Sequence, residues 1–335
     1  MNSSTQKDNF FITLLLLLCK WPIFLPFIAA FSFWFLHKRS SNIMTVQKFF
    51  ENFRVGGHRG SPIRQPENTI ASMEQAKREG ADLIEFDVSL TSDGIAVILH
   101  DDTLERTTNM MGAIRSTRFE QLKACNCAAK FQTPEMNFDP AFMSMPTLEE
   151  LVKWAKANGM KMLFDVKDSD KCLIEKLEEL FETYELYDTG IVSSFFPTVA
   201  YRIKHHDPRI LTGLTWRRWF CSYADLNCQI RRQSSLLAHV LALVVDVLYI
   251  WSVKSWLPAF LGVDMLLTHR FEISENYVRN EERAGRKVCA WTVNDENEMI
   301  WMNRTLKIPF LTDKPYLAAS VGATKPLPRV ETIAA

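Results

Sequence analysis

Residues 56–60 are Gly-Gly-His-Arg-Gly, and residues 84–88 are Ile-Glu-Phe-Asp-Val. The second stretch is typical of a buried β-strand. Because strand side chains alternate between faces, Glu85 and Asp87 point to the same side. Two buried carboxylates on one face repel each other and are costly to remove from water unless a cation lies between them. We therefore expect a hard divalent metal ion beside this strand.

Two histidines and an arginine lie near these carboxylates in the sequence. His58 and Arg59 belong to the first stretch, and His100 follows the apolar run at residues 95–99. At the ends of neighbouring strands, these side chains would meet the carboxylates at one edge of a sheet. Two imidazoles, a guanidinium and a metal-binding carboxylate pair are typical of phosphodiester hydrolysis.

The composition excludes some classes of protein. The 335 residues contain 39 Lys plus Arg and 39 Asp plus Glu, so no global positive field attracts nucleic acid, and we expect no nucleic-acid partner. Seven cysteines without repeated Cys-x-x-Cys spacing do not indicate a disulfide framework. The chain is long enough for one α/β barrel.

From residue 54 onward, strand patterns and helix patterns alternate. Apolar residues recur at helical spacing over residues 68–79, and a capping box at Thr147 and Glu150 begins a later helix. About eight strand–helix units predict a parallel sheet that closes on itself, an α/β TIM (β/α)8 barrel over residues 54–320. The expected strands are residues 55–59, 82–90, 161–167, 190–194, 209–214, 265–268, 287–293 and 308–312.

Two segments lie outside this alternation. Residues 101–145 show little periodicity, so we expect a small insertion after the second strand that covers one end of the sheet. Residues 321–335 contain proline and alanine and predict a disordered tail.

The N-terminus becomes hydrophobic after a polar segment at residues 1–9. Residues 10–36 are long enough to cross a bilayer and lack a clear cleavage site, which favours a transmembrane anchor over a cleaved signal peptide. Residues 37–53 would link this anchor to the barrel. Their positive charges place the barrel in the cytosol, whereas glycosylation patterns at Asn2 and Asn303 are typical of a lumenal chain.

A second hydrophobic region covers residues 236–263. If this region crossed a bilayer, the strands before and after it would lie on opposite sides, so a closed barrel and a second span exclude each other. We therefore predict an interfacial or re-entrant insertion over residues 216–263, with four tryptophans at the depth of the lipid headgroups. These are Trp216, Trp219, Trp251 and Trp256. The alternative is a helix buried against the barrel.

Several motifs together resemble the glycerophosphodiester phosphodiesterase family. They occur in order as His58-Arg59-Gly60, Pro66-Glu67-Asn68-Thr69, Glu85-Phe86-Asp87, Thr91-Ser92-Asp93-Gly94, His100-Asp101-Asp102-Thr103-Leu104-x-Arg106-Thr107-Thr108, Phe164-Asp165-Val166-Lys167, Ser193-Ser194-Phe195, Trp291-Thr292-Val293-Asn294 and Thr312-Asp313. The N-terminal anchor, the Phe-Asp-Val-Lys motif and the late hydrophobic insertion look most like the membrane-bound animal branch of this family. The resemblance implies a TIM barrel with the family insertion at residues 101–145.

The resemblance also implies roles for individual residues. The implied metal ligands are Glu85, Asp87 and Asp165, although many relatives have glutamate at the third position. The implied catalytic pair is His58 and His100, and the implied phosphate-contacting residues are Arg59 and Lys167. Trp291, at a late strand end, is either barrel core or a pocket wall near the glycerol. Glu67 either caps the following helix or lines the metal site.

Oxygen ligands favour a hard ion, so we expect Mg²⁺, with Ca²⁺ as the alternative. His58 would act as general base and His100 as general acid on the leaving alkoxide, while water or the glycerol 2-hydroxyl attacks phosphorus. These groups predict metal-dependent hydrolysis of a phosphodiester. The family resemblance implies that the substrates are glycerophosphodiesters, such as glycerophosphoinositol, which would give glycerol 3-phosphate and an alcohol.

Two other functions stay open. The anchor and the interfacial insertion would suit a lysophospholipase D that acts on membrane lysophospholipids or on N-acyl lysophosphatidylethanolamine. A non-catalytic membrane scaffold for a signalling protein is the other, although a retired site would not retain costly buried charges. The resemblance implies an integral membrane glycoprotein of the plasma membrane or of the endoplasmic reticulum and endomembranes, with a lumenal or extracellular catalytic domain.

Overall fold

The computed structural model describes residues 30–132 and 143–323. The chain divides into two compact units after Lys38. In the first unit, residues 30–36 are helical. The rest of the predicted anchor, residues 10–29, lies outside the described residues, as does the predicted tail from residue 324 onward.

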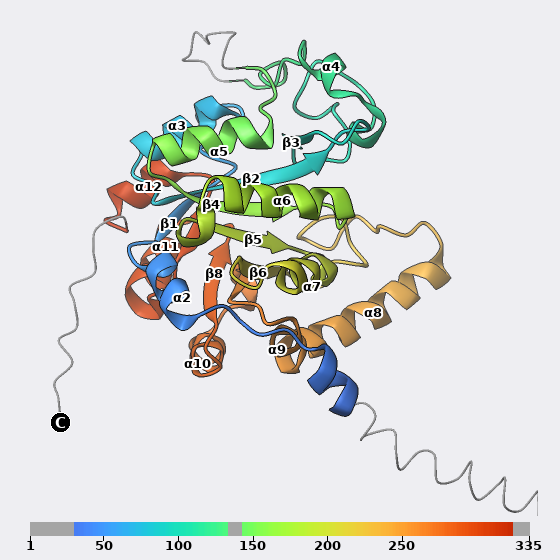
Figure 1. Cartoon of the computed structure of the whole chain (residues 1–335), viewed down its shortest axis with the longest axis vertical. Coiled ribbons are helices and arrows are strands. Elements are labelled where there is room, and N and C mark those ends of the chain that lie inside the picture. The colour runs from blue at the N-terminus through green and yellow to red at the C-terminus, as the bar shows by residue number, and fades with distance from the viewer. Residues whose placement is uncertain (1–29, 133–142, 324–335) are drawn as a thin grey trace, which may run out of the picture. The chain divides into compact units, whose positions relative to one another are not determined.

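Within the described residues, the second unit is built on a closed barrel of eight parallel strands, as the sequence predicted (Figure 1). Neighbours follow the order β1-β2-β4-β5-β6-β7-β8-β9, and β9 pairs with β1 to close the ring. The carboxyl ends of all these strands therefore lie at one end of the barrel. The strands are β1 Val55–His58, β2 Leu83–Leu90, β4 Lys161–Val166, β5 Gly190–Ser194, β6 Leu211–Trp216, β7 Met265–His269, β8 Lys287–Trp291 and β9 Phe310–Thr312.

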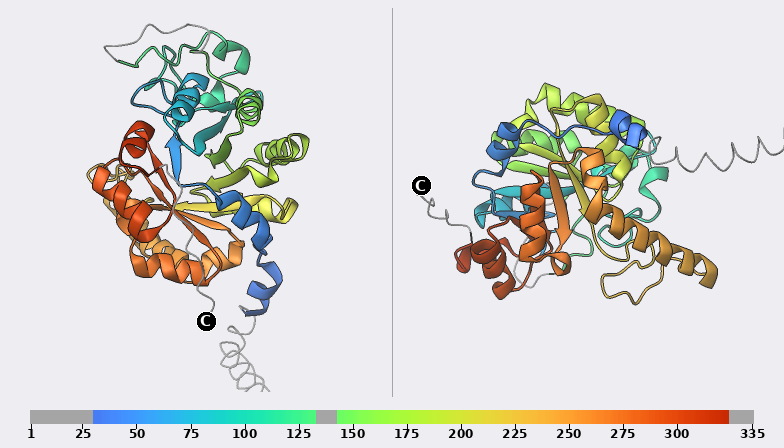
Figure 2. Two further views of the ribbon diagram at one scale, coloured as in Figure 1. Left: turned by 90° about the vertical axis from the view of Figure 1, so that its left-hand side faces the viewer. Right: turned by 90° about the horizontal axis from the view of Figure 1, so that it is seen from below.

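Helices surround the strands, as Figure 2 shows. The longer ones are α3 Ile70–Arg78, α5 Leu148–Ala157, α6 Lys171–Thr183, α7 Pro197–His206, α8 Leu236–Ser255 and α10 Glu275–Arg283. The shorter ones are η3 Leu186–Asp188, α9 Leu257–Leu261, η4 Arg270–Glu272, α11 Glu296–Ile300, the π-helix η5 Trp301–Leu306, and α12 Pro315–Ser320.

Helix starts follow the capping residues. The predicted capping box of α5 is confirmed, because Glu150 N donates to Thr147 Oγ1 at 3.2 Å and Thr147 N donates to Glu150 Oε2 at 2.8 Å. Helix α3 begins two residues later than predicted. Asn68 has a φ of 60°, in the left-handed region, so Thr69 becomes the N-cap and the helix starts after it.

Part of the predicted linker at residues 37–53 is a helix, α2 (Ile43–Phe50). Val46 and Phe49 are buried, and with Phe53 they join the apolar cluster inside the barrel. Val46 and Phe49, three residues apart, lie on one face of α2, and Phe53 follows the end of the helix. This segment is therefore part of the barrel core and not a free connection.

The predicted insertion at residues 101–145 follows a short strand, β3 (Ala96–Ile98), that pairs antiparallel with β2. It contains η1 (Ile114–Ser116) and α4 (Phe119–Leu122). Residues 133–142 lie outside the described part. The insertion shares an apolar cluster with the β3 region, made of Val97, Leu99, Leu104, Ile114, Leu122, Cys125, Cys127 and Met145.

The second hydrophobic region contains the 20-residue helix α8, which projects past the carboxyl ends of the strands (Figure 1). Of the described residues, α8 alone forms a helix that is long and apolar enough to cross a membrane. The strands that flank it, β6 and β7, are direct neighbours in the barrel.

Trp216 does not lie at a membrane surface, contrary to the prediction. It ends β6 and is fully buried, and its Nε1 donates to Thr268 Oγ1 at 3.1 Å and to Tyr277 Oη at 3.2 Å. Helix α9 packs in the same buried cluster as Trp216. Some of the apolar residues at 216–263 belong to the barrel core and others are exposed. The exposed insertion is therefore shorter than predicted.

Candidate active site

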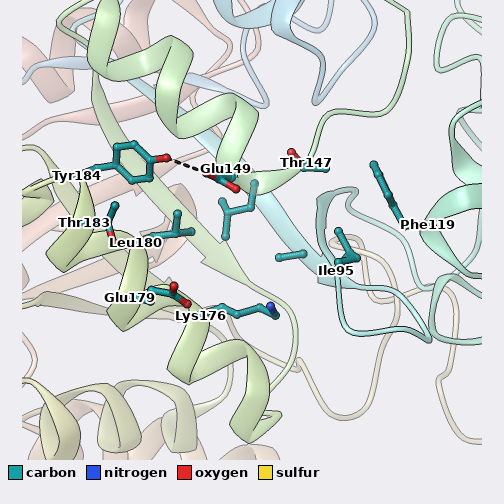
Figure 3. Close-up of a pocket in the computed structure, with 11 residues that line it drawn as sticks. Ile95, Phe119, Thr147, Glu149, Lys176, Glu179, Leu180, Thr183 and Tyr184 are labelled. Carbon is teal, nitrogen blue, oxygen red and sulfur yellow. Dashed lines mark hydrogen bonds between the residues drawn. The ribbon is translucent and has the colours of Figure 1, made fainter.

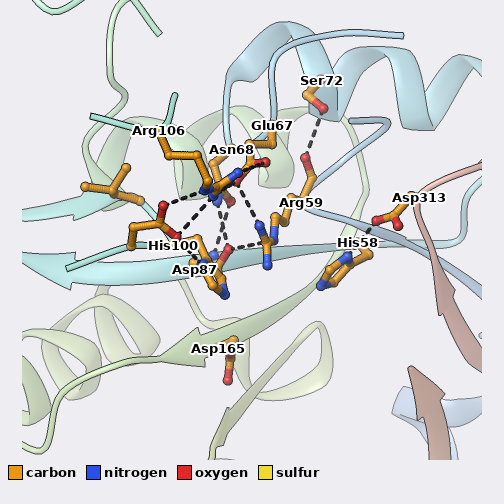
Figure 4. Close-up of polar contacts among 12 residues, drawn as sticks. His58, Arg59, Glu67, Asn68, Ser72, Asp87, His100, Arg106, Asp165 and Asp313 are labelled. Atoms are coloured by element: carbon orange, nitrogen blue, oxygen red, sulfur yellow. Dashed lines mark hydrogen bonds and ion pairs between the residues drawn. The ribbon is translucent and has the colours of Figure 1, made fainter. Parts of the chain in front are cut away.

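The polar residues of the motifs gather at the carboxyl end of the barrel (Figure 4). Glu85 and Asp87 lie on β2, and Asp165 on β4 is the register partner of Asp87. One oxygen from each carboxylate lies within 4.8 Å of the others, and all three residues are buried. The three expected metal ligands therefore form one acidic cluster.

Two cationic side chains lie against this acidic cluster. Lys167 Nζ contacts Asp165 Oδ2 and lies 2.7 Å from Asp87 Oδ1. Arg59 Nε lies 3.3 Å from Asp87 Oδ2, and the Arg59 backbone N–H donates to Glu85 Oε2 at 2.7 Å. Arg59 has a φ of 59°, and with this left-handed backbone both its N–H and its guanidinium face the cluster.

The acidic cluster fits a hard divalent cation. Burial and the neighbouring Asp87 raise the pKa of Glu85 to about 8. Burial alone would raise the pKa of Asp87, but Lys167 and Arg59 hold that pKa well below its usual range. Asp165 Oδ1 is buried and has no hydrogen-bond partner among the described residues. A cation bound by these oxygens would give Asp165 Oδ1 a partner and offset the repulsion felt by Glu85.

His58 ends β1 beside the acidic cluster, and its Nδ1 lies 2.7 Å from Asp313 Oδ1. Asn294 Nδ2 donates to the other oxygen of Asp313 at 2.6 Å. Burial lowers the pKa of His58, but the carboxylates of Glu85 and Asp313 outweigh burial and raise it above its ordinary value. The arrangement fixes the ring of His58 and leaves Nε2 for proton transfer.

His100 lies across the site from His58 (Figure 4), and its Nδ1 lies 2.6 Å from Asp101 Oδ1. Arg106 NH2 donates to Asp101 Oδ1 at 3.1 Å and to Glu67 Oε1 at 2.7 Å. Glu67 Oε1 also accepts a hydrogen bond from Arg59 NH1 at 2.8 Å. Glu67 is thus the bridge between two arginines and is not brought into the acidic cluster.

Aromatic side chains form one wall of this site. Trp291 lies at the end of β8, and its Nε1 donates to Leu267 O at 3.1 Å. The ring of Phe195 packs edge-on against Trp291, with centroids 5.5 Å apart, and stacks on Phe220 at 4.5 Å. The ring of His269 also packs against Trp291, with centroids 5.1 Å apart. Trp291 therefore lines the cavity above the acidic cluster, together with His58, His100 and Lys167.

A larger hollow lies on the side of the barrel, between α5 and α6 (Figure 3). Its volume is about 370 Å³, against about 160 Å³ for the cavity above the acidic cluster. Its polar lining includes Glu149 and Lys176. Glu149 accepts a hydrogen bond from Tyr184 Oη at 2.8 Å. It contains none of the predicted site residues, so the smaller cavity is the candidate active site.

Comparison with known proteins identifies the family of this chain. The model of the glycerophosphoryl diester phosphodiesterase family matches residues 58–317, which is most of the chain. The chain belongs to this family. It is a glycerophosphodiester phosphodiesterase, and members of the family depend on a divalent metal.

Relatives of this phosphodiesterase match over most of their length. The chain is 30% identical to glycerophosphodiester phosphodiesterase 1 of Homo sapiens and 32% identical to that of Bos taurus, in each case over 82% of both chains. A phosphodiesterase from Oleispira antarctica, solved with its product sn-glycerol-3-phosphate, has a TM-score of 0.61 and 26% identity, covering 80% of this chain and 96% of its own. A glycerophosphodiester phosphodiesterase from Agrobacterium tumefaciens has a TM-score of 0.61 at 19% identity, covering 80% and 99%.

Sequence reasoning missed some polar partners in the phosphodiesterase site. Asn68 was expected only at a helix start, yet its Nδ2 donates to Asp87 Oδ2 at 2.8 Å and its Oδ1 accepts from Asp87 N at 3.2 Å. Arg106 and Asp313 had no assigned role. All three lie within the motifs that carried the family resemblance, which was the available signal.

Proposed function

We propose that this phosphodiesterase cleaves small deacylated glycerophosphodiesters, such as glycerophosphoinositol, to glycerol 3-phosphate and an alcohol with a bound divalent metal ion. One observation supports this function above all. Three buried carboxylates, two histidines and two cationic side chains meet at the carboxyl end of one barrel.

Glu85, Asp87 and Asp165 would hold the metal, and their oxygen donors favour Mg²⁺, with Ca²⁺ as the alternative. When bound, the ion supplies positive charge to the phosphoryl oxygens. Arg59 and Lys167 would bind the same phosphate. The support for this role is that both contact the acidic cluster and line the cavity. Fixed cations stabilise the negative charge that gathers on a phosphoryl group in its transition state.

The two histidines would divide the proton transfers. His58 Nε2 takes the proton of the attacking hydroxyl, from water or from the glycerol 2-hydroxyl, while Asp313 holds Nδ1. His100 donates a proton to the leaving alkoxide as the phosphorus–oxygen bond breaks. Asp101 holds His100 Nδ1, and Arg106 holds Asp101 in place. In the route through the glycerol 2-hydroxyl, a cyclic phosphate forms first and water opens it.

A lysophospholipase D activity, on lysophospholipids or on N-acyl lysophosphatidylethanolamine, is the second candidate. The observation that favours it is the exposed apolar surface of α8. This helix projects past the carboxyl ends of the strands (Figure 1), and the residues that line the cavity lie at these strand ends. A substrate with an acyl chain would lie in a membrane, and the apolar side chains of α8 would contact the surface of that membrane. Trp291 would then contact the glycerol end of either substrate.

The protein would act at a membrane through the hydrophobic run at residues 10–36, as an integral membrane protein of the plasma membrane or of endomembranes. This run meets the length needed to cross a bilayer. A lumenal or extracellular catalytic domain follows from the family resemblance.

Product analysis tests the substrate class. The purified full chain in detergent micelles would be given glycerophosphoinositol, glycerophosphocholine or a lysophospholipid, with Mg²⁺, Ca²⁺ or EDTA. We expect release of glycerol 3-phosphate from the deacylated diesters, abolished by EDTA. Preference for the lysophospholipid would favour the second candidate, and cleavage that is insensitive to EDTA would contradict the metal-dependent route.

A further inference from the structure

Helix α8 has the reverse of the polarity expected for a helix on a soluble protein. Its inner stripe carries His239, Asp246 and Ser252, all buried. Its outer surface is apolar, with Leu237 70%, Leu241 57% and Leu248 59% exposed. Surface helices of soluble proteins place polar residues outward, so this outer surface requires an apolar partner. The outer face of α8 consists of Leu236, Leu237, Val240, Leu241, Val244, Val245, Val247, Leu248 and Trp251.

Asp246 explains why the polar residues face inward. Its carboxylate is fully buried and accepts hydrogen bonds from Cys221 N and Ser222 N, both at 2.9 Å, and from Ser222 Oγ. These donors belong to the active-site loop, defined as residues 217–235, which connects β6 to α8. Asp246 therefore ties the middle of α8 to this loop.

The connections of α8 exclude a membrane crossing by this helix. β6 and β7 are hydrogen-bonded neighbours, and Leu214 is the register partner of Leu266. The chain therefore leaves the barrel and returns to it on one side. If α8 crossed the bilayer, Asp246 would also lose its hydrogen bonds to the loop, and its carboxylate would lie in the membrane without a partner.

The active-site loop continues to the wall of the cavity. Phe220, next to the Asp246 contacts, stacks on Phe195, which packs against Trp291. Leu226 of the same loop lines the cavity beside His58. One continuous set of contacts therefore joins the inner stripe of α8 to the place where the substrate would bind.

The charge of the active-site loop favours a lipid surface as the partner of α8. The loop contains four arginines and one aspartate. Arg231 and Arg232, just before α8, are exposed, and Lys254 is exposed near the other end of the helix. Basic residues beside an apolar helix face are attracted to anionic lipid headgroups while the apolar side chains enter the interface.

We propose that the outer face of α8 lies in the headgroup region of a lipid bilayer without crossing it, so that the active-site loop opens the catalytic cavity toward lipid-borne phosphodiesters. The part of this inference that concerns the substrate rests on the second candidate function proposed above, the lysophospholipase D activity. The contact with the bilayer does not depend on it.

The depth of Trp251 tests the contact. The full chain would be reconstituted into phosphatidylcholine vesicles that contain a minor fraction of phosphatidylserine. The phosphatidylcholine carries bromine either near the headgroup end of its acyl chain or at the far end of that chain. The difference in fluorescence between the wild type and Trp251→Phe isolates this residue. We expect strong quenching by the shallow bromines and weak quenching by the deep ones. Stronger quenching from the deep bromines would indicate a span, and no quenching would indicate another partner, such as a second copy of the chain; both results overturn the proposal.

Turnover at the membrane tests the consequence for the substrate. Leu241→Ser/Leu248→Ser makes the outer face more polar. As a control, Met111→Ser changes an apolar residue of the insertion that is even more exposed than these two leucines. The quantity to compare is the ratio of two rates, that for lysophosphatidylethanolamine in the same vesicles divided by that for soluble glycerophosphoinositol. We expect this ratio to fall about tenfold in the double variant and to stay unchanged in Met111→Ser. An unchanged ratio in the double variant contradicts the proposal. If the wild type cleaves neither substrate, the proposed function fails, while the quenching of Trp251 still decides the contact.

Discussion

His58 Nδ1 lies 2.7 Å from Asp313 Oδ1, so the residue that ends β1 and the residue that follows β9 form one polar pair where the barrel closes. Asp313 raises the pKa of His58, against the lowering effect of burial. A base with a raised pKa becomes active only at higher pH, because it must first lose its proton.

Asp313→Asn should therefore lower the pKa of His58 and move the acid limb of the profile of kcat/KM against pH to lower pH. It should also lower kcat by about tenfold to a hundredfold, because the ring is no longer held by a carboxylate. The pH–rate profile of the variant measures both effects. A lower rate with an acid limb at the wild-type pH would show that Asp313 does not act through His58.

The acidic cluster predicts the effect of removing one metal ligand. Asp165→Asn and Glu85→Gln each remove an anionic oxygen donor, so Mg²⁺ binding should weaken and the Mg²⁺-dependent rate should fall by at least about a hundredfold. Isothermal titration calorimetry and the rate at rising Mg²⁺ concentration measure these changes. Asp188→Asn, at an exposed surface ion pair with Lys48, is the matched control. Wild-type Mg²⁺ binding by both ligand variants would contradict the assignment.

Arg106 predicts a positioning effect. Arg106→Ala removes the donors that hold Asp101 and Glu67, so both His100 and Arg59 lose a fixed neighbour. We expect kcat to fall by about tenfold, with partial recovery in Arg106→Lys, since a lysine keeps the charge but not the forked geometry. Arg115→Ala, which removes another half-exposed arginine of the insertion, should have little effect. Equal losses in the two alanine variants would indicate a general effect on folding.

The acidic cluster was predictable because strand geometry alone specifies it. Alternation on one strand pairs Glu85 with Asp87, and the parallel register brings Asp165 opposite Asp87. The bridge from Glu67 to Arg106 was not predictable in this way. It joins residues 39 positions apart through an insertion without periodicity, so no local pattern indicated the contact.

Hydropathy gave an incomplete picture of the membrane-facing region for a similar reason. Trp216 and Trp251 both belong to apolar stretches, but one ends a core strand and the other is 63% exposed on α8. Only the packing of neighbouring elements determines which of the two tryptophans is buried and which is exposed. Asp246 is a charged residue inside the apolar sequence of α8, and its hydrogen bonds to Cys221 and Ser222 depend on how the loop folds back.

A buried ion pair below the site predicts the effect of a mutation on stability. Lys204 Nζ lies 2.7 Å from Asp264 Oδ2, both side chains are fully buried, and Asp264 also accepts hydrogen bonds from Ser41 N and Thr212 N. Asp264→Asn should destabilise the fold by about 3–5 kcal/mol, because it leaves the charge of Lys204 without a partner. Adding Lys204→Met should recover part of this loss. Urea unfolding of the full chain in detergent measures both, and a double variant less stable than Asp264→Asn would contradict the explanation.

The catalytic roles of the two histidines are tested most directly by the turnover of glycerophosphoinositol in His58→Ala and His100→Ala, with Mg²⁺ binding measured on the same samples. We predict that each variant binds Mg²⁺ and loses at least about a hundredfold in kcat, since each lacks one proton-transfer group. Near-wild-type turnover by either variant, with Mg²⁺ bound, would contradict the role given to that histidine.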